Sequence, residues 1–146
     1  MIYFHTEDIK FTLKKKTILK KWIASTINKK KRLLGELNIV FCSDDFLLDI
    51  NKQYLQHDTL TDIVTFDYSK EDIQIPVSGD IFISIDRVKE NAKKFSKDFE
   101  SELHRVIIHG TLHLLGYKDK TKPHKLEMTN QEDRCLKELK NCLNKE

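Results

Sequence analysis

The sequence has few glycines, prolines and cysteines: 4, 2 and 3, respectively, among 146 residues. So little glycine and proline excludes collagen-like and linker-rich chains. No apolar run reaches the roughly 20 residues that a membrane-spanning helix needs, and the N-terminus lacks the pattern of a secretion signal. Three cysteines without a C-x-x-C pair predict free thiols, which are typical of a reducing compartment. We therefore expect a globular protein of the cytoplasm.

Acidic residues are absent from one long segment. Residues 10–34 contain ten lysines and arginines and no aspartate or glutamate, although the formal net charge of the chain is +3. Apolar residues at Ile18, Trp22 and Ile27 give this segment a helical period. Its cations either solvate the outer face of that helix or contact RNA phosphates, and we favour RNA contact because no acidic residue opposes them. The predicted RNA-contacting residues are Lys14, Lys15, Lys16, Lys20, Lys21, Lys29, Lys30, Lys31 and Arg32.

Hydrophobic periodicity predicts the element order β-α-β-α-β-β-α-α-α. The expected strands are residues 2–4, 37–42, 63–68 and 81–85. A polar loop between the last two strands favours their antiparallel pairing. This order indicates one α+β domain over residues 1–146, in which a small four-stranded mixed sheet packs with about five helices.

Capping and breaking residues indicate where the helices begin and end. The helix of the basic segment is expected to end at Gly35, and Asp86 is expected to cap a later helix. The helix over residues 98–115 is apolar nearly all round in its second half, which predicts burial. Pro123 is expected to open the last helix. Residues expected to face inward include Tyr54 and Leu126.

The most specific motif is HGTLHLLGYKDK, at residues 109–120. His109 and His113 are four positions apart, so both lie on one face of the predicted helix. Gly116 ends that helix, which allows Asp119 to return toward the imidazoles. Two imidazoles and a carboxylate suit one Zn²⁺ ion with a fourth position left for water, whose pKa zinc lowers to about 7. The sequence therefore predicts a metal site at the end of a buried helix.

Other interpretations of this motif remain open. The two histidines could be hydrogen-bonded core residues, but their spacing and the helix end after them favour a metal. His124 competes with Asp119 as the third ligand, and Asp119 is favoured because His124 is expected inside the next helix. Gly110 stands where the H-E-x-x-H motif of zinc peptidases carries its glutamate base, which disfavours peptide hydrolysis.

The segment HGTLHLLGYKD is similar to the signature of the YbeY family of bacterial endoribonucleases. LTDIVTFDY at residues 60–68 resembles the P-T-D-V-L-S-F segment of that family, and GDIFIS at residues 79–84 resembles its G-D-I strand. NKQYL at residues 51–55 matches the stretch that precedes them. The resemblance runs over most of residues 37–136. It implies a single zinc held by three residues, cleavage of single-stranded RNA in the cytoplasm, and a role in 16S rRNA 3′-end processing and small-subunit quality control.

Two positions depart from the family pattern. The third ligand of the family is usually histidine, whereas this chain carries Asp119, a harder and charged ligand. The pattern also places an arginine six residues before the threonine that corresponds to Thr61, and Leu55 occupies that position here. Lys52 or His57 would have to replace its positive charge.

These observations predict a metal-dependent endoribonuclease, that is, a phosphodiester hydrolase. His109 and His113 are its expected catalytic centre and Asp62 its candidate proton acceptor, although such an acid more often caps a turn. The alternative is a non-catalytic RNA or ribosome assembly factor with a structural zinc, which needs a fourth protein ligand such as His124. The expected partners are single-stranded rRNA and the small ribosomal subunit, with neither a membrane nor DNA.

Overall fold

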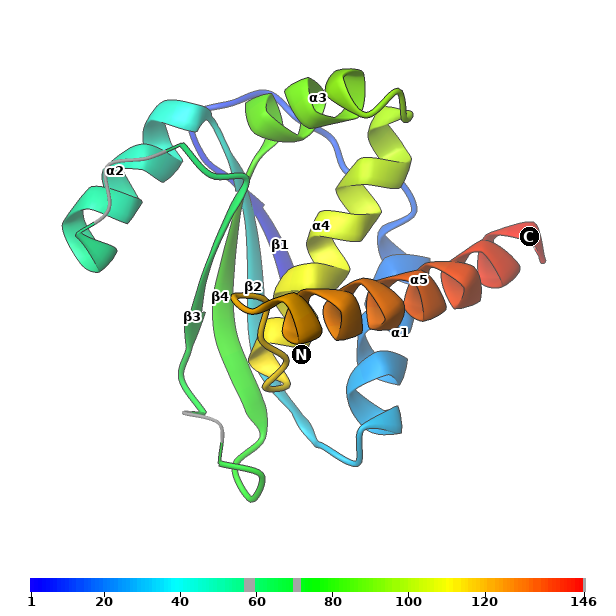
Figure 1. The fold of residues 1–146 in the computed structure, drawn as a ribbon. Helices are drawn as coiled ribbons and strands as arrows, with labels where there is room; N and C mark the ends of the chain where they lie inside the picture. Colours follow the sequence, from blue (N-terminus) through cyan, green and yellow to red (C-terminus); the bar gives the residue numbers. More distant parts are fainter. Residues whose placement is uncertain (57–59, 70–71, 146) are drawn as a thin grey trace.

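The protein is built on one mixed sheet (Figure 1), seen in a computed structural model that describes residues 1–56, 60–69 and 72–145. Among these residues, four strands pair in the order β1-β2-β4-β3. Strands β1, β2 and β4 run parallel to one another, and β3 pairs antiparallel with β4. The mixed sheet and the antiparallel pair confirm the sequence prediction. The strands are β1 (Ile2–Thr6), β2 (Leu34–Cys42), β3 (Ile63–Asp67) and β4 (Val77–Ser84).

Helices lie on both faces of the sheet. On one face α4 packs along the strands, and α1 and α5 pack beside it around the main hydrophobic core. On the other face α2 covers a smaller apolar cluster. The helices of the described chain are α1 (Lys16–Lys29), α2 (Asp44–Leu55), α3 (Ile85–Lys94), α4 (Phe99–Leu114) and α5 (Lys122–Asn144).

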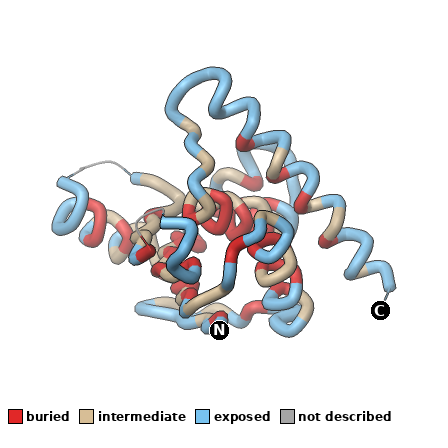
Figure 2. Tube along the Cα trace, turned by 90° about the horizontal axis from the view of Figure 1, so that it is seen from below, coloured by how far each residue is buried: buried red, intermediate tan, exposed pale blue. Residues whose placement is uncertain are grey.

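The main core lies between the two central strands and α4. Alternate residues of β2 and β4 point toward α4, because side chains along a strand alternate between its faces. Leu37, Ile39, Ile81 and Ile83 are all fully buried there. Figure 2 shows the buried positions gathered along these central elements, whereas α5 has buried positions only at intervals along its length. This burial makes α4 a rigid base for the side chains at its end.

Gly110 lets α4 lie directly against the sheet. A Cβ atom at this position would lie 2.8 Å from Cδ1 of Ile63 and 2.9 Å from Cγ2 of Ile81. The position that holds the glutamate base in zinc peptidases therefore faces the sheet in this protein. A glutamate side chain would not fit there, which accounts for the glycine and argues against the peptidase interpretation.

Two expected helix boundaries are wrong. Helix α1 ends at Lys29 rather than at Gly35, because Lys31 adopts a left-handed conformation with φ 60° and turns the chain, and Gly35 lies within β2. The cap of α3 is Ser84, whose hydroxyl accepts a backbone N–H of the first turn, so Asp86 lies inside that turn. In both cases the boundary is set by another residue than the one predicted: Lys31 turns the chain after α1, and Ser84 caps α3.

Two side chains expected to face inward are exposed. Tyr54 is 67% exposed because α2 packs on the sheet through Leu47 and Ile50, earlier in the helix. Leu126 is 64% exposed because the buried stripe of α5 begins only at Met128. The prediction that a proline opens α5 is confirmed.

The cysteines and the helices agree with two expectations from the sequence, free thiols and no membrane-spanning helix among the described residues. All three cysteines are free thiols. Among the described residues, no helix combines the length and apolarity that crossing a bilayer requires.

Gly79 of β4 lies in close contact with β3 and α4. A Cβ atom on Gly79 would lie 2.3 Å from the backbone oxygen of Phe66, which cannot move without breaking the sheet. We expect Gly79→Ala to lower the free energy of unfolding by about 1–3 kcal/mol or more. Gly110→Ala should cost less, because its Cβ meets isoleucine methyl groups and alanine favours the helix by about 1 kcal/mol. Urea denaturation followed by circular dichroism measures both, and an equal loss would contradict this account.

Candidate metal centre

The C-terminal end of α4 places two imidazoles side by side. His109 and His113 are one turn apart, and their ring centroids are separated by 4.6 Å. The helix ends at Leu114. Gly116 follows with φ +100°, a backbone conformation that residues other than glycine rarely adopt. The chain can therefore turn back toward the histidines immediately after the second of them.

The returning loop brings Asp119 to both histidines. One of its carboxylate oxygens, Oδ2, lies 3.2 Å from Nε2 of His109 and 3.2 Å from Nε2 of His113. The ligand atoms of the three residues all lie within 4.8 Å of one another. All three side chains are partly exposed, at 22%, 27% and 36%, so a solute can reach the group.

These distances fit a metal ion. Two ligands that bind tetrahedral zinc at about 2.0–2.1 Å are themselves about 3.3 Å apart. The separations between Asp119 and each imidazole match that edge. Two neutral imidazoles and a carboxylate are also a donor set that divalent zinc accepts. His109, His113 and Asp119 can therefore hold one ion between them.

A buried glutamate orients the first imidazole. Nδ1–H of His109 donates to Oε2 of Glu132, at 2.5 Å. Nη1 of Arg105 holds the other oxygen of the same carboxylate at 2.7 Å, and Glu132 is only 6% exposed. A carboxylate on Nδ1 directs the opposite nitrogen, Nε2, toward the metal position and makes it a stronger ligand.

Glu132 was absent from the sequence predictions, yet a signal for it exists. The buried stripe of α5 consists of Met128, Glu132, Cys135 and Leu139, at helical spacing. A glutamate inside an apolar stripe is unusual because burying a charge costs free energy unless it is paired. Such a residue is therefore a candidate partner for a buried histidine or arginine elsewhere in the chain.

The pKa values of His109 and His113 are shifted in opposite directions. Burial lowers the pKa of His109, but the hydrogen bond and charge of Glu132 outweigh burial, so its pKa is raised overall. Burial and the charge of His109 together lower the pKa of His113. Without a metal, the higher pKa lets His109 keep its proton to higher pH than His113 does.

A cavity of about 350 Å³ opens beside His109 and is rich in carboxyl groups. Asp62, Glu102 and Asp119 line it together with Glu132. Burial raises the pKa of Asp62, and the charge of His109 opposes part of that rise. Burial also raises the pKa of Glu102, and the charge of Asp62 adds to it. Arg105 and Lys125 also line this cavity, so its acidic side chains outnumber its lysine and arginine side chains by four to two.

His124 lies apart from this group. It is exposed in the first turn of α5, where its backbone N–H donates to the capping hydroxyl of Thr121. Its side chain lines a different cavity, beside Tyr117. Among the described residues, the histidines and acids close enough to share an ion are His109, His113 and Asp119.

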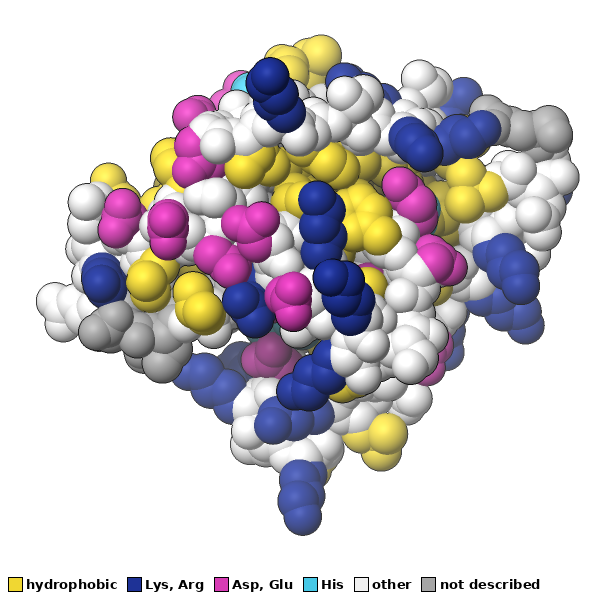
Figure 3. All heavy atoms as spheres, turned by 90° about the horizontal axis from the view of Figure 1, so that it is seen from above, with side chains coloured by type: hydrophobic (Ala, Val, Ile, Leu, Met, Phe, Trp, Pro, Cys, Tyr) yellow, Lys and Arg dark blue, Asp and Glu magenta, His cyan; other side chains and the backbone are white. Residues whose placement is uncertain are grey.

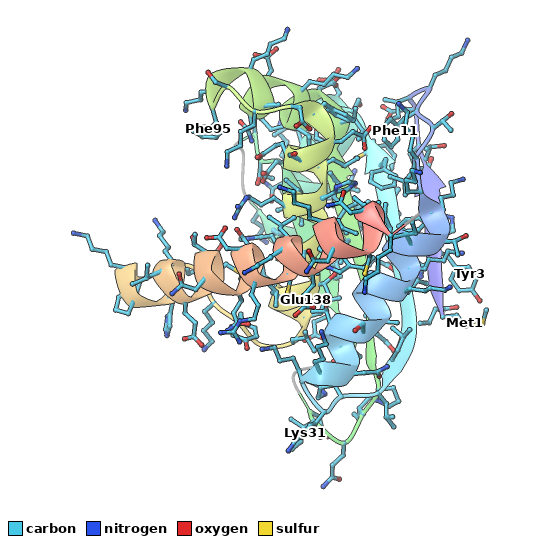
Figure 4. The ribbon with its side chains drawn as sticks, turned by 90° about the vertical axis from the view of Figure 1, so that its right-hand side faces the viewer. Met1, Tyr3, Phe11, Lys31, Phe95 and Glu138 are labelled. Carbon is cyan, nitrogen blue, oxygen red and sulfur yellow. The ribbon has the colours of Figure 1, made fainter. Side chains whose placement is uncertain are left out.

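The basic residues in and around α1, which the sequence predicted to contact RNA, do not share one environment. Lys29 forms an ion pair with Glu138 at 2.8 Å, whereas Arg32 is 7% exposed and donates to backbone oxygens. Figure 4 shows Glu138 on α5, and Lys31 lies at the lower end of α1. Lys14, Lys16, Lys20 and Lys21 are exposed toward the other end of the helix. The segment is therefore divided between two regions of the surface.

The position of the missing family arginine lies at the end of α2. Leu55 is the last residue of that helix and is 40% exposed. Lys52, one of the two candidate substitutes, is exposed on α2. His57, the other, lies outside the described residues.

The fold and the donor set define a class of small α+β proteins in which two histidines and an acid that could hold a metal ion meet at the end of a buried helix. The chain belongs to the Endoribonuclease YbeY family, whose model matches residues 1–140. It is 50% identical to the Endoribonuclease YbeY of Flavobacterium psychrophilum over 94% of this chain and 95% of that protein. It is 46% identical to the Endoribonuclease YbeY of Cytophaga hutchinsonii over 92% of this chain and 93% of that protein. The resemblance inferred from the motif is thereby confirmed.

A solved structure agrees with this membership. The solution structure of TM1509 from Thermotoga maritima superposes with a TM-score of 0.69 over 99% of this chain and 93% of that chain, at 28% identity. The relatives are named endoribonucleases, which places the chain in a family of nucleases.

The two histidines should titrate separately in metal-free protein. The raised pKa of His109 means that its protonated form stabilises the fold fully below pH of about 6.5, and this stabilisation disappears as the pH rises through the higher folded pKa. Histidine NMR titration should give His109 the higher pKa of the pair. Glu132→Gln should lower the pKa of His109 and change that of His113 less. A higher pKa for His113 in the native protein would contradict the assigned hydrogen bond.

Proposed function

We propose that this protein is a zinc-dependent endoribonuclease specific for single-stranded RNA. Its proposed place is the cytoplasm, where it acts in rRNA maturation through 16S 3′-end processing and in quality control of the small ribosomal subunit. The observation that carries the proposal is the single carboxylate oxygen of Asp119 equidistant from two imidazole nitrogens. Family membership supports RNA as the substrate, and the free thiols fit a reducing compartment.

His109, His113 and Asp119 are the proposed ligands. When bound, zinc supplies Lewis acidity that polarises a phosphoryl oxygen and acidifies water. Glu132 holds the His109 ring in the tautomer that leaves Nε2 free, and Arg105 holds Glu132. Because the three ligands are partly exposed, an RNA phosphate can approach from the solvent side.

Asp62 is the proposed proton acceptor. It lines the same cavity as His109 and Asp119, and its pKa is raised by burial. A carboxylate with a raised pKa is a stronger base than one in open water, which suits it to take the proton of an attacking hydroxyl. The backbone oxygen of Asp62 accepts the N–H of Ser84, which ties this residue to the end of β4.

The alternative is an RNA or ribosome assembly factor in which zinc is structural. A structural zinc is normally closed by a fourth protein ligand. Among the described residues, His109, His113 and Asp119 lie close enough together to share one ion. His124, the candidate fourth ligand, lines another cavity. This count supports the catalytic interpretation.

The decisive experiment combines metal content with RNA cleavage. His113→Ala should lose zinc and slow cleavage of a single-stranded RNA by about 100-fold or more, since the ion is expected to supply several kcal/mol of transition-state stabilisation. Asp119→Ala should also lose zinc, whereas His124→Ala should keep one zinc per chain. Zinc is measured by atomic emission, and cleavage on a labelled oligonucleotide with and without a chelator.

His5→Ala is the matched control. His5 is an exposed histidine of β1 whose ring bonds to Asn38, on a strand remote in sequence from the motif. This variant should retain both zinc and cleavage, which shows that replacing a histidine outside the motif does not affect either property. Loss of cleavage in His113→Ala protein purified in the same way excludes a contaminating nuclease. Full cleavage by zinc-free His113→Ala protein would refute the proposal. Full zinc content without cleavage in the native protein would favour the assembly factor.

A further inference from the structure

A second cavity lies beside the loop that carries Asp119. Its volume is about 490 Å³, and it opens where the chain leaves α1, the loop after α4 turns, and α5 begins. Four nitrogen-bearing side chains, one aromatic ring and one carboxylate contribute to its wall. They are Lys30, Arg32, Tyr117, Lys118, His124 and Glu127.

Arg32 is a buried cation for which the described residues supply no anionic partner. It is 7% exposed, and its Nη2 donates to the backbone oxygens of Asp72 and Ile75, at 3.1 and 3.2 Å. Its Nε is buried with no hydrogen-bond partner, and the ion pairs of the described chain do not include it. Buried charges in proteins are normally paired, because removal from water costs more than neutral oxygens return. A guanidinium without its anion on the wall of a cavity therefore indicates that the anion comes from a ligand.

Lys30 is held in place without being neutralised. Its Nζ donates to the neutral side-chain oxygen of Gln131 at 3.0 Å and lies 5.2 Å from the ring centroid of Tyr117. Both contacts fix the ammonium group and leave its charge uncompensated. Lys118 adds a third cation from the loop itself. The carboxylate of Glu127 opposes them, so the wall carries three formal positive charges and one negative charge.

We propose that this cavity binds a backbone phosphate of the RNA strand, at a position beside the bond that is cut. The proposal rests on the proposed function, because RNA is taken as the substrate. Lys118 and Asp119 are adjacent residues, so the cavity and the metal centre share one loop. A phosphate held by Lys30, Arg32 and Lys118 would align the strand with the centre, which is a positioning role.

The first experiment measures RNA binding without cleavage. A fluorescent single-stranded oligonucleotide with 2′-O-methyl riboses serves as the probe, and fluorescence anisotropy gives its Kd over a range of salt concentrations. The double variant Lys30→Ala/Lys118→Ala should raise Kd about tenfold and reduce the salt slope by about 0.7, since each phosphate neutralised on a single strand contributes about 0.7. Glu127→Gln should lower Kd, because it removes the opposing charge.

The matched control removes two lysines from α3. Lys89 and Lys93 are exposed on α3, and Figure 3 looks onto this end of the molecule, where basic and acidic side chains are mixed. Lys89→Ala/Lys93→Ala changes the net charge by the same amount and should leave the salt slope unaltered. Equal Kd and slope changes in the two double variants would refute the proposal, because they would show a general effect of charge.

The second experiment observes Arg32 directly and leaves it unmutated, since its removal could unfold the chain. The Nε–H resonance of Arg32 should shift and saturate when the 2′-O-methyl oligonucleotide is added to ¹⁵N-labelled protein. Inorganic phosphate should produce the same shift only at much higher concentration. An unchanged resonance at saturating oligonucleotide would overturn the proposal. Saturation by inorganic phosphate at equal concentration would also overturn it, in favour of a site for a free anion.

The two proposals fail in distinguishable ways. If native protein holds no zinc and cleaves no RNA, yet the Arg32 resonance shifts with the oligonucleotide, the cavity binds RNA and the nuclease proposal fails. If zinc-dependent cleavage is present and the resonance does not move, the nuclease proposal stands and the cavity assignment fails.

Discussion

The close contact between α4 and the sheet is the constraint on which the site depends. Gly110 removes the side chain that would hold the helix away from Ile63 and Ile81, and the helix is buried along most of its length. A buried helix has little freedom to shift, so the two imidazoles at its end keep their separation. The left-handed turn at Gly116 then decides where the following loop returns. Packing thus arranges the donor atoms of the candidate metal site.

Two cavities beside the end of α4 differ in the charge of their walls. On one side of the loop after α4, carboxyl groups line the cavity at His109, where they favour a cation. On the other side, lysines and a buried arginine line the cavity at Tyr117, where they favour an anion. Of the two adjacent loop residues, Lys118 lines the cavity at Tyr117 and Asp119 lines the cavity at His109. A metal-dependent nuclease, as proposed for this protein, uses both properties next to each other, because its substrate is anionic and its metal ion is cationic.

Much of the fold and part of the centre followed from local patterns. The order of elements was predictable because strands and helices have different hydrophobic periods, and the His109–His113 pair was visible because a helix turn brings such residues together. Glu132 was not predicted, because it lies 23 residues from His109 along the chain and meets it only through the packing of α5 on α4. Arg32 resembled its lysine neighbours in sequence, and only the tertiary contacts show that it is buried.

The sequence by itself determined the element order, the motif that carries the donor atoms and the glycine that stands in place of a peptidase base. These depend on residues close together in the chain, whose geometry a helix or turn dictates. The tertiary structure alone decided which acid supports His109, which basic residues lie near the centre, and how closely Asp119 approaches both imidazoles. Those outcomes depend on how α1, α4 and α5 pack against one another, and packing depends on contacts between residues distant in sequence.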